Sequence, residues 1–222
     1  MEAAHETLTE LGRDDRDALL ALGVPRRHRA GEVIVHAGDE SGAVYVVLAG
    51  RVKITVLAEG GKEAVLGFRG PGALLGEMAA IDGSPRAATV TAIEEVRLSV
   101  VPGGAFRRLL DERPSFAHGV LRSVLARLRE ADRDRLEVAA YDVTGRVARR
   151  LVALADEHGT ALPDGSVAIG LPLSQEELAA WTASSREAVG RALHLLRRLG
   201  WIRTDRRRIT VRDLDALRRL AP

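Results

Sequence analysis

The chain has 222 residues, of which 46% are hydrophobic and 29% are charged, a balance typical of a folded globular protein rather than a disordered one. It contains no cysteine, which excludes disulfides, iron–sulfur clusters, thiolate-bound zinc and cysteine nucleophiles. The first residues, MEAAHETLTELGRDD, are acidic and lack the apolar core of a signal peptide. No uncharged stretch reaches the roughly 18 residues that a membrane span needs. We therefore expect a cytoplasmic protein without a membrane partner.

Positive charge is concentrated near the end of the chain. Residues 1–140 carry 19 basic and 21 acidic side chains, a net charge of −2, whereas residues 141–222 carry 14 and 10, a net charge of +4. Residues 186–212 alone contain nine arginines and two acidic residues, a net charge of +7. Such a concentration of arginine indicates a surface that faces a polyanion.

The N-terminal half is predicted to be a helical lead-in followed by strands. Leucines recur with a helical period in residues 1–24. Between residues 25 and 101, short β-branched runs alternate with glycine-containing turns, which is typical of an antiparallel barrel or roll. The expected strands cover residues 32–36, 43–48, 52–57, 64–68, 88–93 and 96–101.

A short helix is expected over residues 103–112, ended by Pro114, and a long helix over residues 115–141. Six positions of the long helix follow the spacing of a coiled-coil seam: Leu121, Leu125, Leu128, Asp132, Arg135 and Ala139. One side of an intramolecular helix pair would show the same spacing. The length of the segment, without a partner helix of matching length beside it, favours a dimerisation stalk in a homodimer.

The C-terminal part has the element order of a winged helix-turn-helix. An amphipathic helix follows Asp142, and the polar segment from His158 to Ser166 is expected to be a loop. Two closely spaced helices come next, and WIRTDRRRITV is predicted to form strand, turn and strand. The predicted fold class is α+β. Its parts are a jelly-roll-like antiparallel β-roll over residues 1–113, a dimerisation helix over 114–141 and a winged helix-turn-helix over 142–222.

The segment GEMAAIDGSPRAATV, residues 76–90, has the features of an anion site. Its glycine allows close approach of the backbone to a ligand, and the turn that follows presents free N–H groups. Arg86 can hold two phosphate oxygens, and the small Ala87 and Ala88 leave room and offer N–H donors. Glu77 is suited to accepting from a sugar hydroxyl. The alternative is a Glu77–Arg86 ion pair that braces the turn.

Two helix starts lie close together after residue 173. Ser174…Glu177 and Ser184…Glu187 both match the capping box, in which a serine and a glutamate satisfy backbone N–H groups reciprocally. An apolar set is expected to form the buried side of the two helices: Leu178, Ala179, Val189, Leu193 and Leu196.

The second of these helices carries side chains that suit DNA. Arg186, Glu187 and Arg191 lie near its N-terminal end. In the major groove, arginine pairs with guanine O6 and N7, and glutamate accepts from cytosine N4. Glu187 and Arg191 stand four residues apart, so an ion pair on a solvated helix face is the alternative.

These motifs resemble those of one family. GEMAAIDGSPRAATV is similar to the phosphate-binding cassette of cyclic-nucleotide-binding domains, as in protein kinase A regulatory subunits and bacterial cyclic-AMP receptor proteins. SSREAVGRAL, residues 184–193, resembles the recognition helix of the cyclic-AMP receptor and anaerobic regulator (Crp/Fnr) superfamily of transcription factors, and residues 142–148 resemble its hinge. The resemblance spans essentially the whole chain in the order of that family.

The resemblance implies a homodimeric DNA-binding transcription regulator, without catalysis, that is controlled by a cyclic nucleotide bound in the β-roll, cyclic AMP being favoured. The alternatives are a regulator of the same family that responds to another ligand or to none, and an effector-binding protein that acts through protein contacts alone. The implied effector contacts are Gly76, Glu77, Met78, Ala79, Arg86, Ala87, Ala88 and Asp132. The implied contacts to double-stranded DNA are Gln175, Ser184, Ser185, Arg186, Glu187, Gly190, Arg191, Arg206, Arg207 and Arg208. A palindromic operator with TGTGA-like half-sites, and RNA polymerase, are the implied partners.

The chain departs from the family at several positions. The bacterial cyclic-AMP receptor reads adenine with a Thr-Ser pair on the long helix, where this chain has Ala131-Asp132. The aspartate can accept from an adenine amino group or pair with Arg135 of the second subunit. Ala87 stands where cyclic-GMP-selective kinase domains tend to have threonine, which favours cyclic AMP. Ala183 replaces a common turn glycine, so a positive φ at that residue would be strained.

An enzyme is not indicated, because the sequence offers no nucleophile–base pair and no metal-ligand set. Its six histidines show neither HxH nor HExxH spacing. Trp181 and Trp201 are expected to pack in the core of the winged helix.

Overall fold

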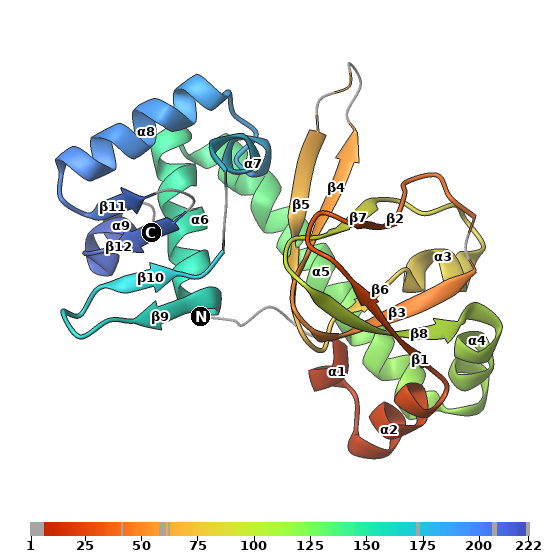
Figure 1. Ribbon diagram of the computed structural model, residues 1–222. Helices are drawn as coiled ribbons and strands as arrows, with labels where there is room; N and C mark the ends of the chain where they lie inside the picture. The colour runs from red at the N-terminus through yellow and green to blue at the C-terminus, as the bar shows by residue number, and fades with distance from the viewer. Residues whose placement is uncertain are drawn as a thin grey trace. The chain divides into compact units, whose positions relative to one another are not determined.

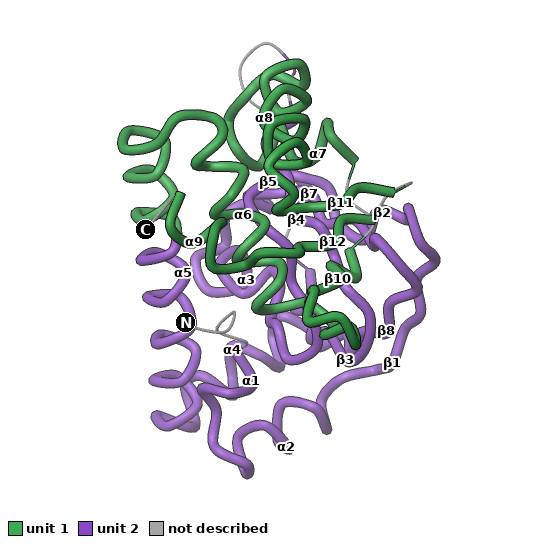
Figure 2. The backbone as a smooth tube through the Cα atoms, turned by 90° about the vertical axis from the view of Figure 1, so that its left-hand side faces the viewer, with its two compact units in different colours: residues 1–3, 131–222 green, residues 4–130 purple. Residues whose placement is uncertain are grey.

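The computed structural model describes residues 7–40, 42–57, 61, 63–171, 174–205 and 208–220 (Figure 1). The chain forms two compact units, the first ending at Glu130 and the second beginning at Ala131 (Figure 2). The three-part division at residues 113 and 141 stays a prediction. Among the described helices, none is long and apolar enough to cross a membrane.

The described strands of the first unit form two sheets. They are β1 (Val24–His28), β2 (Val33–Val35), β3 (Ala43–Ala49), β4 (Val52–Leu57), β5 (Glu63–Arg69), β6 (Leu74–Leu75), β7 (Thr89–Ala92) and β8 (Val96–Pro102). One sheet has the order β1-β8-β3-β6 and the other β2-β7-β4-β5. Every pairing in them is antiparallel, which confirms the predicted roll.

Two of these strands have no counterpart among the predicted ones. β1 reads VPRRH and is exposed over most of its length, so it lacks the alternation that marks a half-buried strand. β6 has only two residues, Leu74 and Leu75, both buried. Both strands exist because they pair with a neighbour, β1 with β8 and β6 with β3. Their own sequences carry too little signal to predict them.

The helices of the first unit follow the prediction closely. They are α1 (Thr7–Glu10), α2 (Arg13–Ala21), α3 (Glu77–Asp82), α4 (Gly103–Glu112) and the long α5 (Pro114–Ala140). The first two form the expected lead-in. The last two lie within one residue of the ranges predicted from the sequence. The long helix begins at Pro114, one residue earlier than predicted, because proline suits the first position of a helix.

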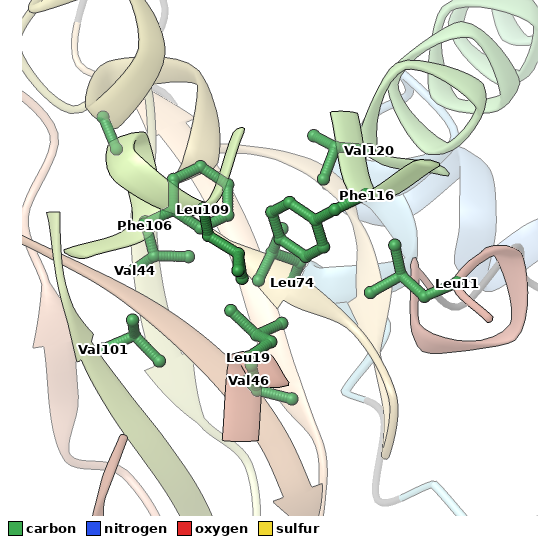
Figure 3. Packing of buried hydrophobic residues seen from close by; sticks show 11 residues of the cluster. Leu11, Leu19, Val44, Val46, Leu74, Val101, Phe106, Leu109, Phe116 and Val120 are labelled. Atoms are coloured by element: carbon green, nitrogen blue, oxygen red, sulfur yellow. The ribbon is translucent and has the colours of Figure 1, made fainter. Parts of the chain in front are cut away.

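An apolar cluster joins these helices to the roll (Figure 3). Phe106 of α4 and Phe116 of α5 pack edge to face, with ring centroids 5.6 Å apart and planes at 77°. Leu19 of α2 and Val44 and Val46 of β3 belong to the same cluster, and all are fully buried. The cluster therefore fixes the start of α5 against the roll.

The part of α5 in the first unit has one buried and one exposed face. Phe116, Val120 and Ala126 are buried. The seam leucines point away from this core, with Leu121 53%, Leu125 39% and Leu128 55% exposed. Within the first unit, no described element covers the three leucines, so the alternative of an intramolecular helix pair finds no partner helix there.

The second unit begins with the last residues of α5. The further described elements are α6 (Val143–His158), β9 (Gly159–Ala161), β10 (Val167–Ile169), α7 (Gln175–Trp181), α8 (Arg186–Arg198), β11 (Ile202–Asp205), β12 (Arg208–Val211) and α9 (Leu214–Leu220). The strands form one antiparallel sheet in the order β11-β12-β10-β9. This arrangement confirms the helix-turn-helix and its wing.

The sheet is larger than the two-stranded wing that the sequence predicts. The segment from His158 to Ser166 is not all loop, because residues 159–161 form β9. Each residue of β9 is exposed, so no apolar alternation marks the strand. The helix α9 was likewise outside the predicted elements. Trp181 and Trp201 are half-buried rather than fully in the core.

The turn between α7 and α8 confirms one predicted cap and shifts the other. Ser174 and Glu177 form the reciprocal capping box. At α8 the cap is Ser185, whose side chain accepts from Ala188 N, so the capping box predicted one residue earlier, at Ser184, is wrong. The predicted apolar side is confirmed, since all five of its members are buried. Ala183 has a φ of 48°, so the alanine that replaces a common turn glycine adopts the left-handed conformation that would be strained.

Replacing Ala183 by glycine should stabilise the protein. A left-handed alanine is strained by about 1–2 kcal/mol, whereas glycine adopts this conformation freely. Part of the stability gained by removing the strain is lost, because glycine has the greater conformational entropy in the unfolded state. We expect Ala183→Gly to raise the free energy of unfolding by about 0.5–1 kcal/mol, measured by urea denaturation at an unchanged m-value. Ala180→Gly, inside α7, is the control and should lower it by about 1 kcal/mol. A loss of stability in Ala183→Gly would contradict the assignment of strain.

Candidate functional site

The cassette, residues 76–90, contains α3 and reaches into β7. Its first residue, Gly76, precedes α3 with a φ of 79°, a conformation that favours glycine. A Cβ at this position would lie 2.0 Å from Nη1 of Arg86. Both the backbone conformation and the available space therefore require glycine, and the result is that the Arg86 guanidinium lies against the start of α3.

Arg86 is buried, with 6% of its surface exposed. Its Nη1 donates to the carbonyl oxygen of Gly76 at 2.9 Å, and its Nη2 donates to the carbonyl oxygen of Ala43. The guanidinium also lies over the ring of Tyr45, 5.6 Å from the centroid. A guanidinium has five N–H donors, and these two hydrogen bonds use one on each of its terminal nitrogens. Arg86 is thus fixed in place with donors left for an anion.

Glu77 is the most deeply buried charged residue of the cassette, with 1% of its surface exposed. Its Oε1 lies 2.7 Å from Nη2 of Arg127, so the carboxylate pairs with α5 and not, as the alternative interpretation had it, with Arg86. Its Oε2 is buried and has no hydrogen-bond partner in the described part of the chain. A buried acceptor without a donor is costly, and a hydroxyl of a ligand would satisfy it.

Arg127 was not among the candidate residues. It lies on α5 between the buried Ala126 and the exposed Leu128, and its side chain is 25% exposed. The only sequence signal for its role is an arginine beside the apolar face of the long helix. That signal does not reveal which distant carboxylate the arginine will meet.

The other implied effector residues differ in burial. Ala79 is buried, Met78 is 52% exposed, and Ala87 and Ala88 are exposed and half-buried, respectively. Asp132 belongs to the second unit, where its Oδ1 lies 3.4 Å from Nη1 of Arg135 in the same chain. Both side chains are exposed, so this contact is weak.

The N-terminal end of α8 presents the predicted DNA-reading side chains. Arg186, Glu187 and Arg191 are all exposed. Nη1 of Arg186 lies 3.6 Å from Oε1 of Glu176, but both side chains are largely exposed, so this ion pair is weak and does not fix either side chain. The pKa of Glu187 is lowered by hydrogen bonds from its own backbone N–H and from the Ser185 side chain, and by the charges of Arg186 and Arg191. Glu187 therefore stays ionised at neutral pH and acts as an acceptor.

The remaining DNA candidates are placed as follows. Gln175 and Ser185 are exposed, and Gly190 is half-buried, with Gln175 Oε1 3.7 Å from the site of a Cβ. Ser184 is half-buried, and its hydroxyl accepts from Nη2 of Arg146 at 3.0 Å. Arg208 is exposed at the start of β12, whereas residues 206 and 207 lie outside the described part of the chain. No group of side chains suited to a metal ion occurs among the described residues.

Known proteins show the same two-part organisation. A model of the cyclic nucleotide-binding domain matches residues 25–113, and a model of the Crp-like helix-turn-helix domain matches residues 145–220. The CRP-like cAMP-activated global transcriptional regulator of Mycobacterium tuberculosis is 33% identical over 191 residues, which cover 86% of this chain and 85% of the relative. The cyclic AMP receptor protein of Thermus thermophilus is 30% identical over 211 residues, 95% of this chain and 94% of the relative.

A solved structure agrees with the sequence relatives. The c-di-GMP responsive global regulator CLP of Xanthomonas campestris superimposes with a TM-score of 0.80 at 26% identity, covering 90% of this chain and 99% of that chain. The fold and the two matched domains define a DNA-binding transcription regulator with a cyclic-nucleotide-binding domain. The chain belongs to the Crp/Fnr family of transcription regulators, which are not enzymes.

Proposed function

We propose that the protein is a homodimeric regulator that binds cyclic AMP in its β-roll and a palindromic operator with its winged helix-turn-helix. The observation that carries the ligand assignment is the pairing of two unused polar groups in one cassette. Arg86 has N–H donors left for a cyclic phosphate, and Glu77 has a buried acceptor left for a ribose hydroxyl. A nucleotide that presents both groups on one edge fits this set.

Two further observations favour cyclic AMP. Ala87 offers no hydroxyl to a guanine, and the relatives in Mycobacterium tuberculosis and Thermus thermophilus are named for cyclic AMP. A different nucleotide is the second candidate, because the structurally similar Xanthomonas regulator responds to c-di-GMP. RNA polymerase is the further partner expected of such a regulator.

Removing the Arg86 side chain should weaken the binding of the nucleotide. The loss of charge-assisted hydrogen bonds to phosphate is expected to cost about 2–3 kcal/mol of binding free energy in Arg86→Ala. Calorimetry on nucleotide-stripped protein with cyclic AMP, cyclic GMP and c-di-GMP would measure this loss of binding free energy. Circular dichroism would check that the variant is folded. Arg26→Ala, on the exposed strand β1, is the control and should bind normally. If Arg86→Ala binds as tightly as the wild type, the cassette is not the phosphate site.

The exposed leucine seam supports the homodimer. Three leucines at coiled-coil spacing, all exposed while the opposite face of α5 is buried, form an apolar stripe that a second copy can cover.

Placing a charge in this seam should separate the subunits. Leu125→Glu would bring like charges together across the two-fold axis, so we expect a monomer in sedimentation at micromolar concentration. Leu57→Glu, at a leucine of β4 that is 74% exposed, is the control and should remain a dimer. A wild-type protein that is already monomeric under these conditions would refute the proposal.

The exposed N-terminal end of α8 supports its role as the recognition helix. Arg186 and Arg191 are assigned to guanines and Glu187 to a cytosine, which fits a TGTGA-like half-site. In a two-fold symmetric dimer the recognition helices reach half-sites about 34 Å apart, one turn of the duplex. Arg206, Arg207 and Arg208 are assigned to phosphates, which position the protein without reading bases.

The two roles of arginine make different predictions for a selection from random duplex DNA. Arg186→Ala should cost about 1–3 kcal/mol and relax the preference at one base position. Arg207→Ala should weaken all sequences alike and lower the salt slope by about one unit. Arg198→Ala, at the opposite end of α8, is the control and should leave every base preference intact. An unchanged preference in Arg186→Ala would show that α8 is not the reader.

A further inference from the structure

Arg146 connects three segments of the second unit. It lies in the first turn of α6, and its guanidinium points to backbone and hydroxyl oxygens. Its Nη1 donates to the carbonyl oxygen of Tyr141 at 2.7 Å and lies 3.5 Å from that of Val138, both at the end of α5. Its Nε donates to the carbonyl oxygen of Thr182 at 2.8 Å, and its Nη2 to the hydroxyl of Ser184 at 3.0 Å. One side chain thus joins the end of α5 to the turn before α8.

The oxygens that Arg146 binds are ones that the helices leave unsatisfied. The last carbonyl groups of a helix have no partner within it, and a cation nearby is favourable to the helix dipole. Tyr141 follows directly after α5, and Thr182 follows directly after α7. Arg146 therefore caps the C-terminal ends of two helices at once, through a guanidinium whose planar fork directs its donors in fixed directions.

The turn held by Arg146 is the strained one. Ala183, with its φ of 48°, stands between Thr182 and Ser184, the two residues of the turn that Arg146 binds. Strained backbone persists only where the surroundings fix it. The backbone N–H of Ser184 donates to the carbonyl oxygen of Ala179 at 2.9 Å. The hydroxyl of Ser184 donates to the carbonyl oxygen of Thr182 at 3.0 Å. The cap of α8, Ser185, comes next in the chain, so the geometry of this turn determines where α8 begins.

We propose that Arg146 is the positioning residue of the recognition helix. It fixes the turn between α7 and α8 to the end of α5, so that the reading end of α8 keeps one orientation relative to the hinge. Arg146 touches no base in this role. This inference rests on the proposed function, in which α8 reads DNA, but its structural part is measurable without DNA.

The structural part is tested by amide hydrogen exchange in the full-length protein. Arg146→Lys keeps the charge but has one compact ammonium group, which cannot reach the oxygens at both ends. We expect the exchange of the Ser184 amide to speed up by about tenfold, the effect of losing one hydrogen bond to a charged group. Arg149→Lys is the matched control, since Arg149 of the same helix pairs with Glu137 and lies over the ring of Tyr141. It should leave the exchange of Ser184 unchanged.

The functional part is tested by the preference for a selected operator over random duplex. In Arg146→Lys this preference should fall by about tenfold while the slope of log affinity against log salt stays the same, because no phosphate contact is lost. Arg146→Gln, which removes the charge, tests the alternative: a slope reduced by about one unit in this variant would make Arg146 a phosphate contact and overturn the proposal, whereas we expect an unchanged slope. Unchanged exchange at Ser184 would also overturn it. If the wild type itself selects no operator, the proposed function fails, and the exchange experiment still decides the structural role of Arg146.

Discussion

The arrangement of the first unit depends on one buried ion pair. The carboxylate of Glu77 is almost fully withdrawn from water, and such a charge is tolerated only where a partner neutralises it. The partner, Arg127, is carried by α5, so the long helix must dock on the roll with that residue facing α3. The packing of Phe106 against Phe116 holds the start of the same helix. The charge and the apolar contacts together fix the register of α5, and this register turns the seam leucines outward.

A second set of charges ties the end of α5 to α6 within the second unit. Asp134 lies 2.7 Å from Arg150, and Glu137 lies 2.8 Å from Arg149, both on α6. Their side chains are partly buried, so these pairs are less screened than fully exposed ones. The last turns of α5 therefore belong with the helix-turn-helix, and the helix is divided between the two units. The predicted boundary at residue 141 follows the end of the helical pattern, whereas the two compact units meet between Glu130 and Ala131.

Sequence patterns predicted those features whose signal is local. The strands with apolar alternation, the long helix and the box at Ser174 all carry their pattern within a few residues. Glu77 and Arg86 could be proposed as site residues because their residue types stand at fixed offsets in one segment. Arg127 was missed because its partner lies far away in the sequence, and no periodicity on α5 marks that contact. β1 and β9 were missed for a related reason, since pairing with a neighbour makes them strands.

The orphaned oxygen of Glu77 has a consequence for how the site would select its ligand. An acceptor that is buried before binding penalises every ligand that brings no donor to it, since its lack of a partner then persists in the complex. Under the proposed function, a nucleotide with a free 2′-hydroxyl would satisfy the oxygen, whereas a deoxyribose analogue of identical charge and nearly identical shape would leave it unsatisfied. Discrimination between the two sugars would thus need no steric clash. It would follow from a polar group that the fold itself leaves incomplete.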